Sequence, residues 1–364
     1  MTLFVDPQAV TGFAGQVDRA AGHVSEMRRY LTTYAEAGTG GEAFNLARSS
    51  HEHAVSVINA VIYRLACLLE NSAPELRAAA TYYRTTDLAA ADAVDRTLPS
   101  AVDRCITPLE LELANNPCAP ANFADPREVT EQLKPPGEAE NPANALGWMD
   151  YLSPSAWANS AFDIVFGFDP IGELQARLVG DWEALAAMSP VTRNLGSALH
   201  DLAYNVQSGA TTLRPMWQGT AGGAAFRYFT TACNGVADLH GPLNNISQAY
   251  TKLADGVWAI GEAIGGIVKS MLDSAIIAGI SVAAGTATSA TGAGALIGYG
   301  LAAGEVANML RLWGHATNLC QKLSAVVNTF RAALVRALND LDSVYLPALP
   351  DGGRYDHPVA GMAA

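Results

Sequence analysis

Residues 6–34 read DPQAVTGFAGQVDRAAGHVSEMRRYLTTY and predict one long helix with a narrow apolar stripe. Asp6 can accept hydrogen bonds from the free amides of a helix start, and Pro7 suits the first helical position because its missing N–H is not needed there. Apolar side chains then recur at spacings of three and four, as on one face of a helix: Val10, Phe13, Val17, Ala20, Val24, Met27, Leu31 and Tyr34. The glycine-rich residues 38–41 end the pattern.

A second helix follows with a stripe of its own: Phe44, His51, Val55, Ile58, Ile62, Leu65, Leu69, Leu76, Ala80 and Tyr83. We expect Asn71, Ser72 and Pro74 to kink or restart this helix, and Leu98-Pro99 to mark its end. Two stripes joined by a short glycine turn predict an antiparallel helical hairpin over residues 1–98. Two helices alone bury little surface, so the stripe needs a further partner.

Residues 99–170 differ, since they hold ten of the 18 prolines and lose the apolar periodicity. They predict a Pro-rich linker on the surface, with short helices around Leu109–Leu113 and Trp148–Trp157. The segment 146–170 is too aromatic for a free tether, so we expect it to dock on the helical body.

A second hairpin is predicted for residues 171–272. Its first helix carries a stripe from Leu195 to Leu213, and Pro215 stops it. The turn is Trp217-Gln218-Gly219, in which the glycine permits a positive φ. The next helix carries a stripe from Ala225 to Ile264, and we expect Gly241-Pro242 to bend it.

Residues 273–312 form a Gly/Ala-rich unit, in which Ser274–Gly304 has 31 residues with no charge and seven glycines. Its two apolar arms are each about a dozen residues long, whereas a helix needs about 20 residues to span a bilayer. One interpretation is a helical hairpin whose small residues allow close packing, with its arms buried against the helix at 319–345. The other is conditional membrane insertion through the large apolar residues of the arms: Ile276, Ile277, Ile280, Leu296, Ile297 and Leu301. A long C-terminal helix is predicted for 313–346 and a disordered tail for 347–364.

Composition argues against several functions. A net charge of −13 disfavours nucleic acid as a partner and disfavours simple electrostatic attraction to anionic lipid. The five cysteines include no CxxC pair, so we expect no zinc or redox site. His51-Glu52-His53 lacks the His-Glu-x-x-His spacing that places two ligands on one helical face. We therefore expect no enzymatic activity, no cofactor and no metal, and the N-terminus lacks the pattern of a cleavable secretory signal.

Two short motifs stand out, one near the end of the first hairpin and one at the turn of the second. Tyr83-Arg84-Thr85-Thr86-Asp87 fits the pattern YxxxD, and a spacing of four places Tyr83 and Asp87 on one face of a continuous helix. On this basis the first hundred residues resemble the small helical hairpins associated with ESX secretion. Residues 171–312 resemble the WxG-type helical module of actinobacterial type VII secretion substrates, through Asp181-Trp182-Glu183, the turn at 217–219, the bend at 241–242 and the Gly/Ala-rich hairpin.

The resemblance implies an all-α bundle of long antiparallel hairpins that is exported and then secreted or held at the cell envelope. Its partners would be the ATPase and chaperone of the type VII machinery, with a small WxG-type hairpin protein as a further candidate partner. The implied export signal is Tyr83, Asp87, Trp217 and Gly219. In this family the two motifs often belong to the two chains of a heterodimer. Here one chain holds both, so we expect the hairpins to pack head to tail with Trp217 close to Tyr83.

The chain departs from the simple family pattern, because Gly38–Gly41 stands where a WxG turn could be and no toxin domain follows residue 346. The implied function is that of a non-enzymatic effector or envelope-associated interaction protein. Two other functions stay open: a membrane-active protein that forms a pore through residues 274–304, and a cytosolic structural adaptor that is never exported. Cys105 and Cys118 flank a Pro-rich stretch and could form a disulfide after export.

Overall fold

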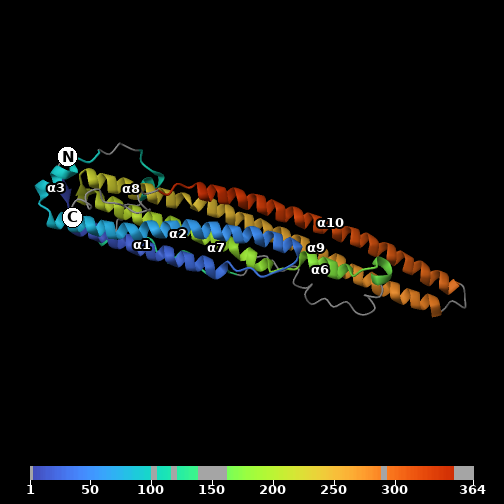
Figure 1. Ribbon diagram of the computed structural model, residues 1–364. Helices are drawn as coiled ribbons and strands as arrows, with labels where there is room; N and C mark the ends of the chain where they lie inside the picture. The colour runs from blue at the N-terminus through green and yellow to red at the C-terminus, as the bar shows by residue number, and fades with distance from the viewer. Residues whose placement is uncertain (1–2, 100–104, 116–120, 138–161, 288–292, 348–364) are drawn as a thin grey trace.

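The computed structural model describes residues 3–99, 105–115, 121–137, 162–287 and 293–347, and it is an elongated all-α bundle (Figure 1). The first hairpin consists of α1 (Pro7–Tyr34) and α2 (Glu42–Thr85). Asp6 accepts hydrogen bonds from the amides of Gln8 and Ala9, as expected for an N-cap. The apolar stripe of α1 is buried from Val10 to Leu31. The predicted fold class is therefore confirmed.

The predicted restart of α2 at Pro74 is wrong, because the helix runs unbroken for 44 residues. Two side chains just before the proline bond to the backbone of the preceding turn. Asn71 donates to the Cys67 carbonyl at 2.8 Å, and Ser72 donates to the Leu68 carbonyl at 2.6 Å. The predicted end near Leu98-Pro99 is also wrong, because α2 ends at Thr85 and a separate helix α3 (Leu88–Asp95) follows.

The second half of the chain supplies the partner that the first hairpin needs. After α6 (Pro170–Leu178), helix α7 (Trp182–Leu213) packs along α1, and its apolar stripe is buried. The chain then passes through η4 (Arg214–Met216) and β2 (Trp217–Gln218) into α8 (Thr220–Asp238). The predicted bend near Gly241-Pro242 separates α8 from α9 (His240–Ala287). The covering helix for the first stripe thus belongs to the same chain.

The last two helices, α9 and α10 (Ala293–Ser343), form a hairpin that extends beyond the other helices (Figure 1). The boundaries expected at 272/273 and 312/313 fall inside these helices, so the Gly/Ala-rich unit and the C-terminal helix are not separate elements. Helix 319–345 belongs to α10 itself and cannot fold back on the arm that precedes it.

The expected burial of the apolar arms is therefore wrong. Ile276 and Ile277 are about half exposed, and Ile280 and Leu301 are 65% and 58% exposed. The small side chains of the same region are buried instead: Ser274, Ala275, Ala278, Ser281 and Ala302. Among the described residues this region consists of α9 and α10, so each arm buries the face that meets the other helix. The side chains of Leu296 and Ile297 lie outside the described residues.

The linker contains the predicted helix near residue 109, α4 (Pro108–Asn115). Thr107 and Glu110 form a reciprocal capping box at its start: the Thr107 amide donates to Glu110 Oε2 at 2.9 Å, and the Glu110 amide to Thr107 Oγ1 at 3.3 Å. The helix expected at 148–157 lies outside the described residues, as does Cys118. Residues 162–168 do dock on the bundle, since the rings of Phe166 and Phe168 lie 6.0 and 5.3 Å from that of Trp313.

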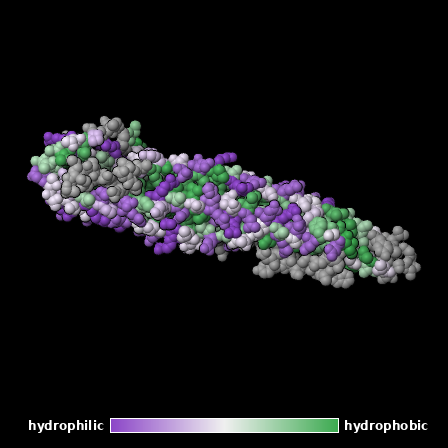
Figure 2. All heavy atoms as spheres, viewed as in Figure 1, coloured by the Kyte–Doolittle hydropathy of each residue, from purple (hydrophilic) through white to green (hydrophobic). Residues whose placement is uncertain are grey.

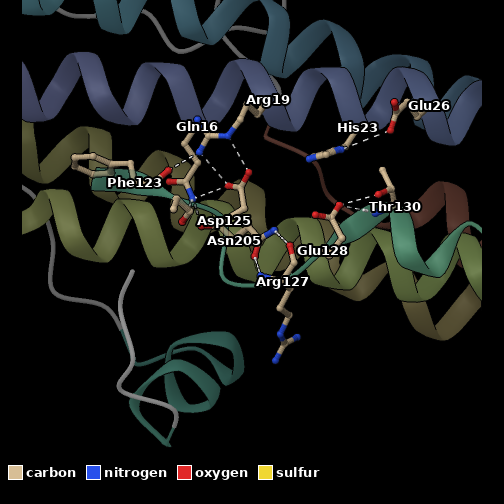
Figure 3. A network of polar contacts seen from close by, with 11 residues as sticks. Gln16, Arg19, His23, Glu26, Phe123, Asp125, Arg127, Glu128, Thr130 and Asn205 are labelled. Carbon is tan, nitrogen blue, oxygen red and sulfur yellow. Dashed lines mark hydrogen bonds and ion pairs between the residues drawn. The ribbon is translucent and has the colours of Figure 1, made fainter. Parts of the chain in front are cut away.

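Residues 121–137 of the linker cross α1 and α7 and include η1 (Ala121–Phe123) and η2 (Val129–Gln132), as Figure 3 shows. The Asn205 side chain on α7 pairs with the backbone of Arg127, donating to its carbonyl at 2.8 Å and accepting from its amide at 2.9 Å. On the α1 side, Arg19 forms an ion pair with Asp125 at 2.9 Å. The linker therefore fastens the two hairpins together through polar contacts.

A buried histidine joins three parts of the bundle. His51 on α2 is 1% exposed and bonds through Nε2 to the Ala35 carbonyl at 2.7 Å and through Nδ1 to the Tyr250 hydroxyl at 2.9 Å. A neutral ring satisfies both contacts, since Nε2 donates to the carbonyl and Nδ1 accepts from the hydroxyl. Burial lowers the pKa of His51 from its ordinary value of 6.5, and the Ala35 hydrogen bond opposes this shift. The nearby charges of Glu52 and Arg48 act in opposite directions.

This histidine predicts a loss of stability on acidification. The unfolded chain binds the proton near pH 6.5 and the folded protein only at lower pH, so the His51 contribution is complete above that pH and declines below it. We expect the free energy of unfolding to fall between pH 7.5 and 5.5 by on the order of 1 kcal/mol more in the wild type than in His51→Gln. Urea denaturation at both pH values measures this. Equal falls in the two proteins would contradict the prediction.

Candidate functional site

The turn at residues 217–219 is held by the N-terminus of the chain. Trp217–Gln218 pairs as an antiparallel strand with β1 (Phe4–Val5), with Phe4 opposite Gln218 and Val5 opposite Trp217. The amide of Asp6 also donates to the Met216 carbonyl at 2.8 Å. Because Asp6 caps α1, the start of the first hairpin and the turn of the second are fixed against each other.

Gly219 is required at this turn for two reasons. Its φ is +124°, a conformation that residues with a side chain rarely adopt. A Cβ atom at this position would also lie only 2.8 Å from Asp95 Oδ2 and 2.9 Å from Leu3 Cδ1. The glycine predicted for the export signal is thus needed for the local backbone and for the close approach of two other segments.

Trp217 lies against Tyr83, as the head-to-tail packing predicted. Their ring centroids are 5.9 Å apart and the rings meet edge to face at 76°. Both side chains are buried, with 2% of Trp217 and 9% of Tyr83 exposed. Burial raises the pKa of Tyr83, and a hydrogen bond with the Trp217 side chain opposes that rise. The two motifs therefore meet in one aromatic contact at one end of the bundle, near α3 and α8 (Figure 1).

Asp87 does not share a helical face with Tyr83, so that prediction is wrong. Helix α2 ends at Thr85, Thr86 is extended, and Asp87 is the N-cap of α3. Its Oδ1 accepts from the amides of Ala89 at 3.0 Å and Ala90 at 3.2 Å. Asp87 is exposed and Tyr83 is buried. The physical reason is that aspartate favours an N-cap, where its carboxylate satisfies the free amides of the next helix.

Two further carboxylates of α3 belong to this site, and the sequence reasoning missed both. Asp92 Oδ1 accepts from the Leu3 amide at 3.1 Å. Asp95 is 4% exposed and accepts from the amides of Thr220 at 2.7 Å and Ala221 at 2.8 Å. An acidic residue at the C-terminal end of a helix is disfavoured by the helix dipole, which is the one signal that could have drawn attention to Asp95.

The polar groups described for this site contact other parts of the same chain. Its carboxylates Asp87, Asp92 and Asp95 are engaged with backbone amides. In the ranges that the structure describes, no three histidine, cysteine, aspartate or glutamate side chains are placed to hold a metal ion. Comparison with protein-family models, curated proteins and solved structures found no match for this chain.

Replacement of Gly219 by alanine should destabilise the protein. Because of the positive φ and the contacts with Asp95 and Leu3, we expect the free energy of unfolding to fall by about 1–3 kcal/mol. Urea denaturation would measure this fall. Gly22→Ala is the matched control, because it lies in the middle of α1 with open space around its Cβ position. We expect that variant to be more stable than wild type by up to about 1 kcal/mol. A Gly219→Ala protein of unchanged stability would show that the turn tolerates a side chain.

Proposed function

We propose that the protein is a substrate of a type VII (ESX) secretion system and that its two half-signals act as one composite surface. The observation that carries this proposal is the contact between Tyr83 and Trp217, one from each motif, at one end of the bundle. The N-terminal strand pairs with residues 217–218, and Asp95 binds the two amides that follow the turn. In the family that the chain resembles, two separate proteins supply these halves.

The partners in this proposal are the ATPase and a chaperone of the secretion machinery. A separate small WxG-type protein is not needed to cover the first hairpin, because α7 of the same chain covers it. After export, the protein would act at the cell surface or outside the cell as a non-enzymatic effector or interaction protein. The buried rings of Tyr83 and Trp217 would shape the surface, while exposed groups such as Asp87 would be read by the machinery.

Asp87 gives the sharpest test of export. We expect wild-type protein in the culture filtrate only of cells with an active type VII ATPase, and Asp87→Ala should stay in the cells. The alanine variant also loses the cap of α3, worth about 1 kcal/mol. Asp87→Ser keeps a capping oxygen but removes the carboxylate, and we expect it to stay in the cells as well. Immunoblots of cell and filtrate fractions measure both.

Two outcomes would contradict this proposal. If Asp87→Ser is exported at the wild-type level, Asp87 serves only as the N-cap of α3 and is not recognised by the machinery. If wild-type protein is exported without the ATPase, the type VII assignment fails. Tyr83→Phe serves as a control, because it keeps the ring against Trp217. Tyr83→Ala is a poor test, since loss of a buried aromatic side chain costs about 3–5 kcal/mol and confuses export with folding.

A second candidate function, membrane activity, is favoured by the exposed apolar side chains near the free end of the α9–α10 hairpin. Ile276, Ile277, Ile280 and Leu301 are exposed there, and Figure 2 shows an apolar patch over this part of the surface. Two stretches, Glu42–Thr85 and Thr220–Ala283, are long and apolar enough to cross a membrane by length and composition alone. A core helix passes the same test, and α2 is a core helix here.

The arm from Ser274 to Ala287 is too short to span a bilayer. At 1.5 Å per residue its length is roughly 21 Å, against a hydrocarbon core of about 30 Å. The carboxylates of this acidic chain also oppose approach to an anionic surface. The uncharged part of α9 is therefore too short to span a bilayer by itself, and we keep export and interaction as the first function.

Liposomes separate the two functions. We expect dye-loaded liposomes to stay intact with wild-type protein between pH 7 and pH 5, because the arm is too short to cross the bilayer. Ile277→Asp supplies the control. It should fold normally, since Ile277 is 46% exposed, whereas a buried charge would cost several kcal/mol. Dye release by wild type that Ile277→Asp abolishes would favour the membrane-active function and contradict our first choice.

A further inference from the structure

Asp95 supplies a helix cap that the turn at residues 217–219 cannot supply for itself. Helix α8 starts directly after Gly219, which is its N-cap residue and has no side-chain oxygen to bind the free amides. The positive φ and close contacts of Gly219 exclude the residues that normally cap a helix. The carboxylate of Asp95 occupies that role from another helix, with bonds of 2.7 and 2.8 Å to Thr220 and Ala221.

Asp95 is the last residue of α3 and makes the last of three contacts formed by carboxylates of this helix and its N-cap. Asp87 caps the start of α3, Asp92 holds the Leu3 amide in the middle, and Asp95 reaches α8 at the end. Asp95 belongs to neither motif, yet its side chain forms the direct polar link between the helix that follows Tyr83 and the helix that follows Trp217. Because it is 4% exposed, it cannot be a contact for an external partner.

We propose that Asp95 is a positioning residue for export, which holds the turn at 217–219 against the end of the first hairpin so that both half-signals face the machinery together. This inference rests on the proposed function and adds the group that makes the two halves one surface. It acts through Gly219 and α8, and through them on Trp217, without touching the partner itself.

Amide hydrogen exchange and export together test this role. In Asp95→Ala, exchange over residues 217–223 should accelerate about tenfold, as expected for loss of a cap, while α9 and α10 keep their protection. Export should fall by about the same factor or more. Asp95→Asn keeps a side-chain oxygen for one of the two amides, so this variant should recover part of the exchange protection and part of the export.

Asp181→Ala is the matched control, because Asp181 caps α7 through the Ala184 amide and lies at the other end of that helix from the turn at 217–219. We expect this variant to lose a comparable cap and to be exported normally. Export of Asp95→Ala at the wild-type level would overturn the proposal. So would a loss of export in Asp181→Ala that matches the loss in Asp95→Ala, since Asp95 would then act only through stability.

The same experiment distinguishes this inference from the proposed function. If wild-type protein is exported independently of the ATPase, the type VII assignment fails. The export level of Asp95→Ala then still shows whether export depends on the contact of Asp95 with the turn at residues 217–219. If wild type needs the ATPase and Asp95→Ala does not differ from it, the assignment stands and the positioning role fails. Unchanged exchange at residues 217–223 in Asp95→Ala would overturn the link itself.

Discussion

The apolar stripe of α1 has to be covered on two sides, and the rest of the structure depends on how α7 covers it. Helix α8 and the linker add to this cover at Phe13, whose ring packs edge to face on Phe229 of α8, with centroids 4.9 Å apart, and also contacts Phe123 of the linker. Each such buried side chain contributes about 1.5–3 kcal/mol. Apolar contact alone leaves the axial position of α1 on α7 loosely defined. Gln16 defines this axial position, because its side-chain amide donates to the backbone carbonyl of Asn205 at 2.9 Å and its side chain fills the space beside Gly209.

That axial position has consequences at the end of the bundle. Once α1 is fixed on α7, the N-terminal strand meets residues 217–218, and the end of α2 brings Tyr83 to Trp217. The polar contacts there are mostly hydrogen bonds from backbone amides to carboxylates of α3. Such bonds fix the orientation of the segments that they join, and each carboxylate has a partner for its charge. The linker adds a second polar fastening through Asn205 and Asp125 (Figure 3). Two motifs that belong to different hairpins are in this way held against each other.

Periodicity in the sequence was enough to predict most of the helices, the first hairpin and its need for a partner, whereas the meeting of Tyr83 with Trp217 was implied by the resemblance to type VII substrates. It could not place Asp87, because a spacing of four fits both a continuous helix and a helix that ends so that the aspartate can cap the next one. It could not find Asp95, whose partners are backbone amides more than a hundred positions away in the sequence. It also misjudged Ile277 and Ile280, since an apolar run does not reveal whether a third helix arrives to cover it.

The two ends of the molecule differ in a way that bears on its function. At one end the aromatic side chains of the motifs are buried and fastened by polar contacts, while near the other end isoleucines are exposed on a two-helix hairpin. Helix α9 alone, with 48 residues, is about 72 Å long. A partner or surface that covers the exposed isoleucines would therefore leave the end with Tyr83 and Trp217 accessible, and the export machinery that we propose would not compete with it for space. Because each end can be altered without touching the other, substitutions at Asp87 and Ile277 would test the two proposed interactions separately.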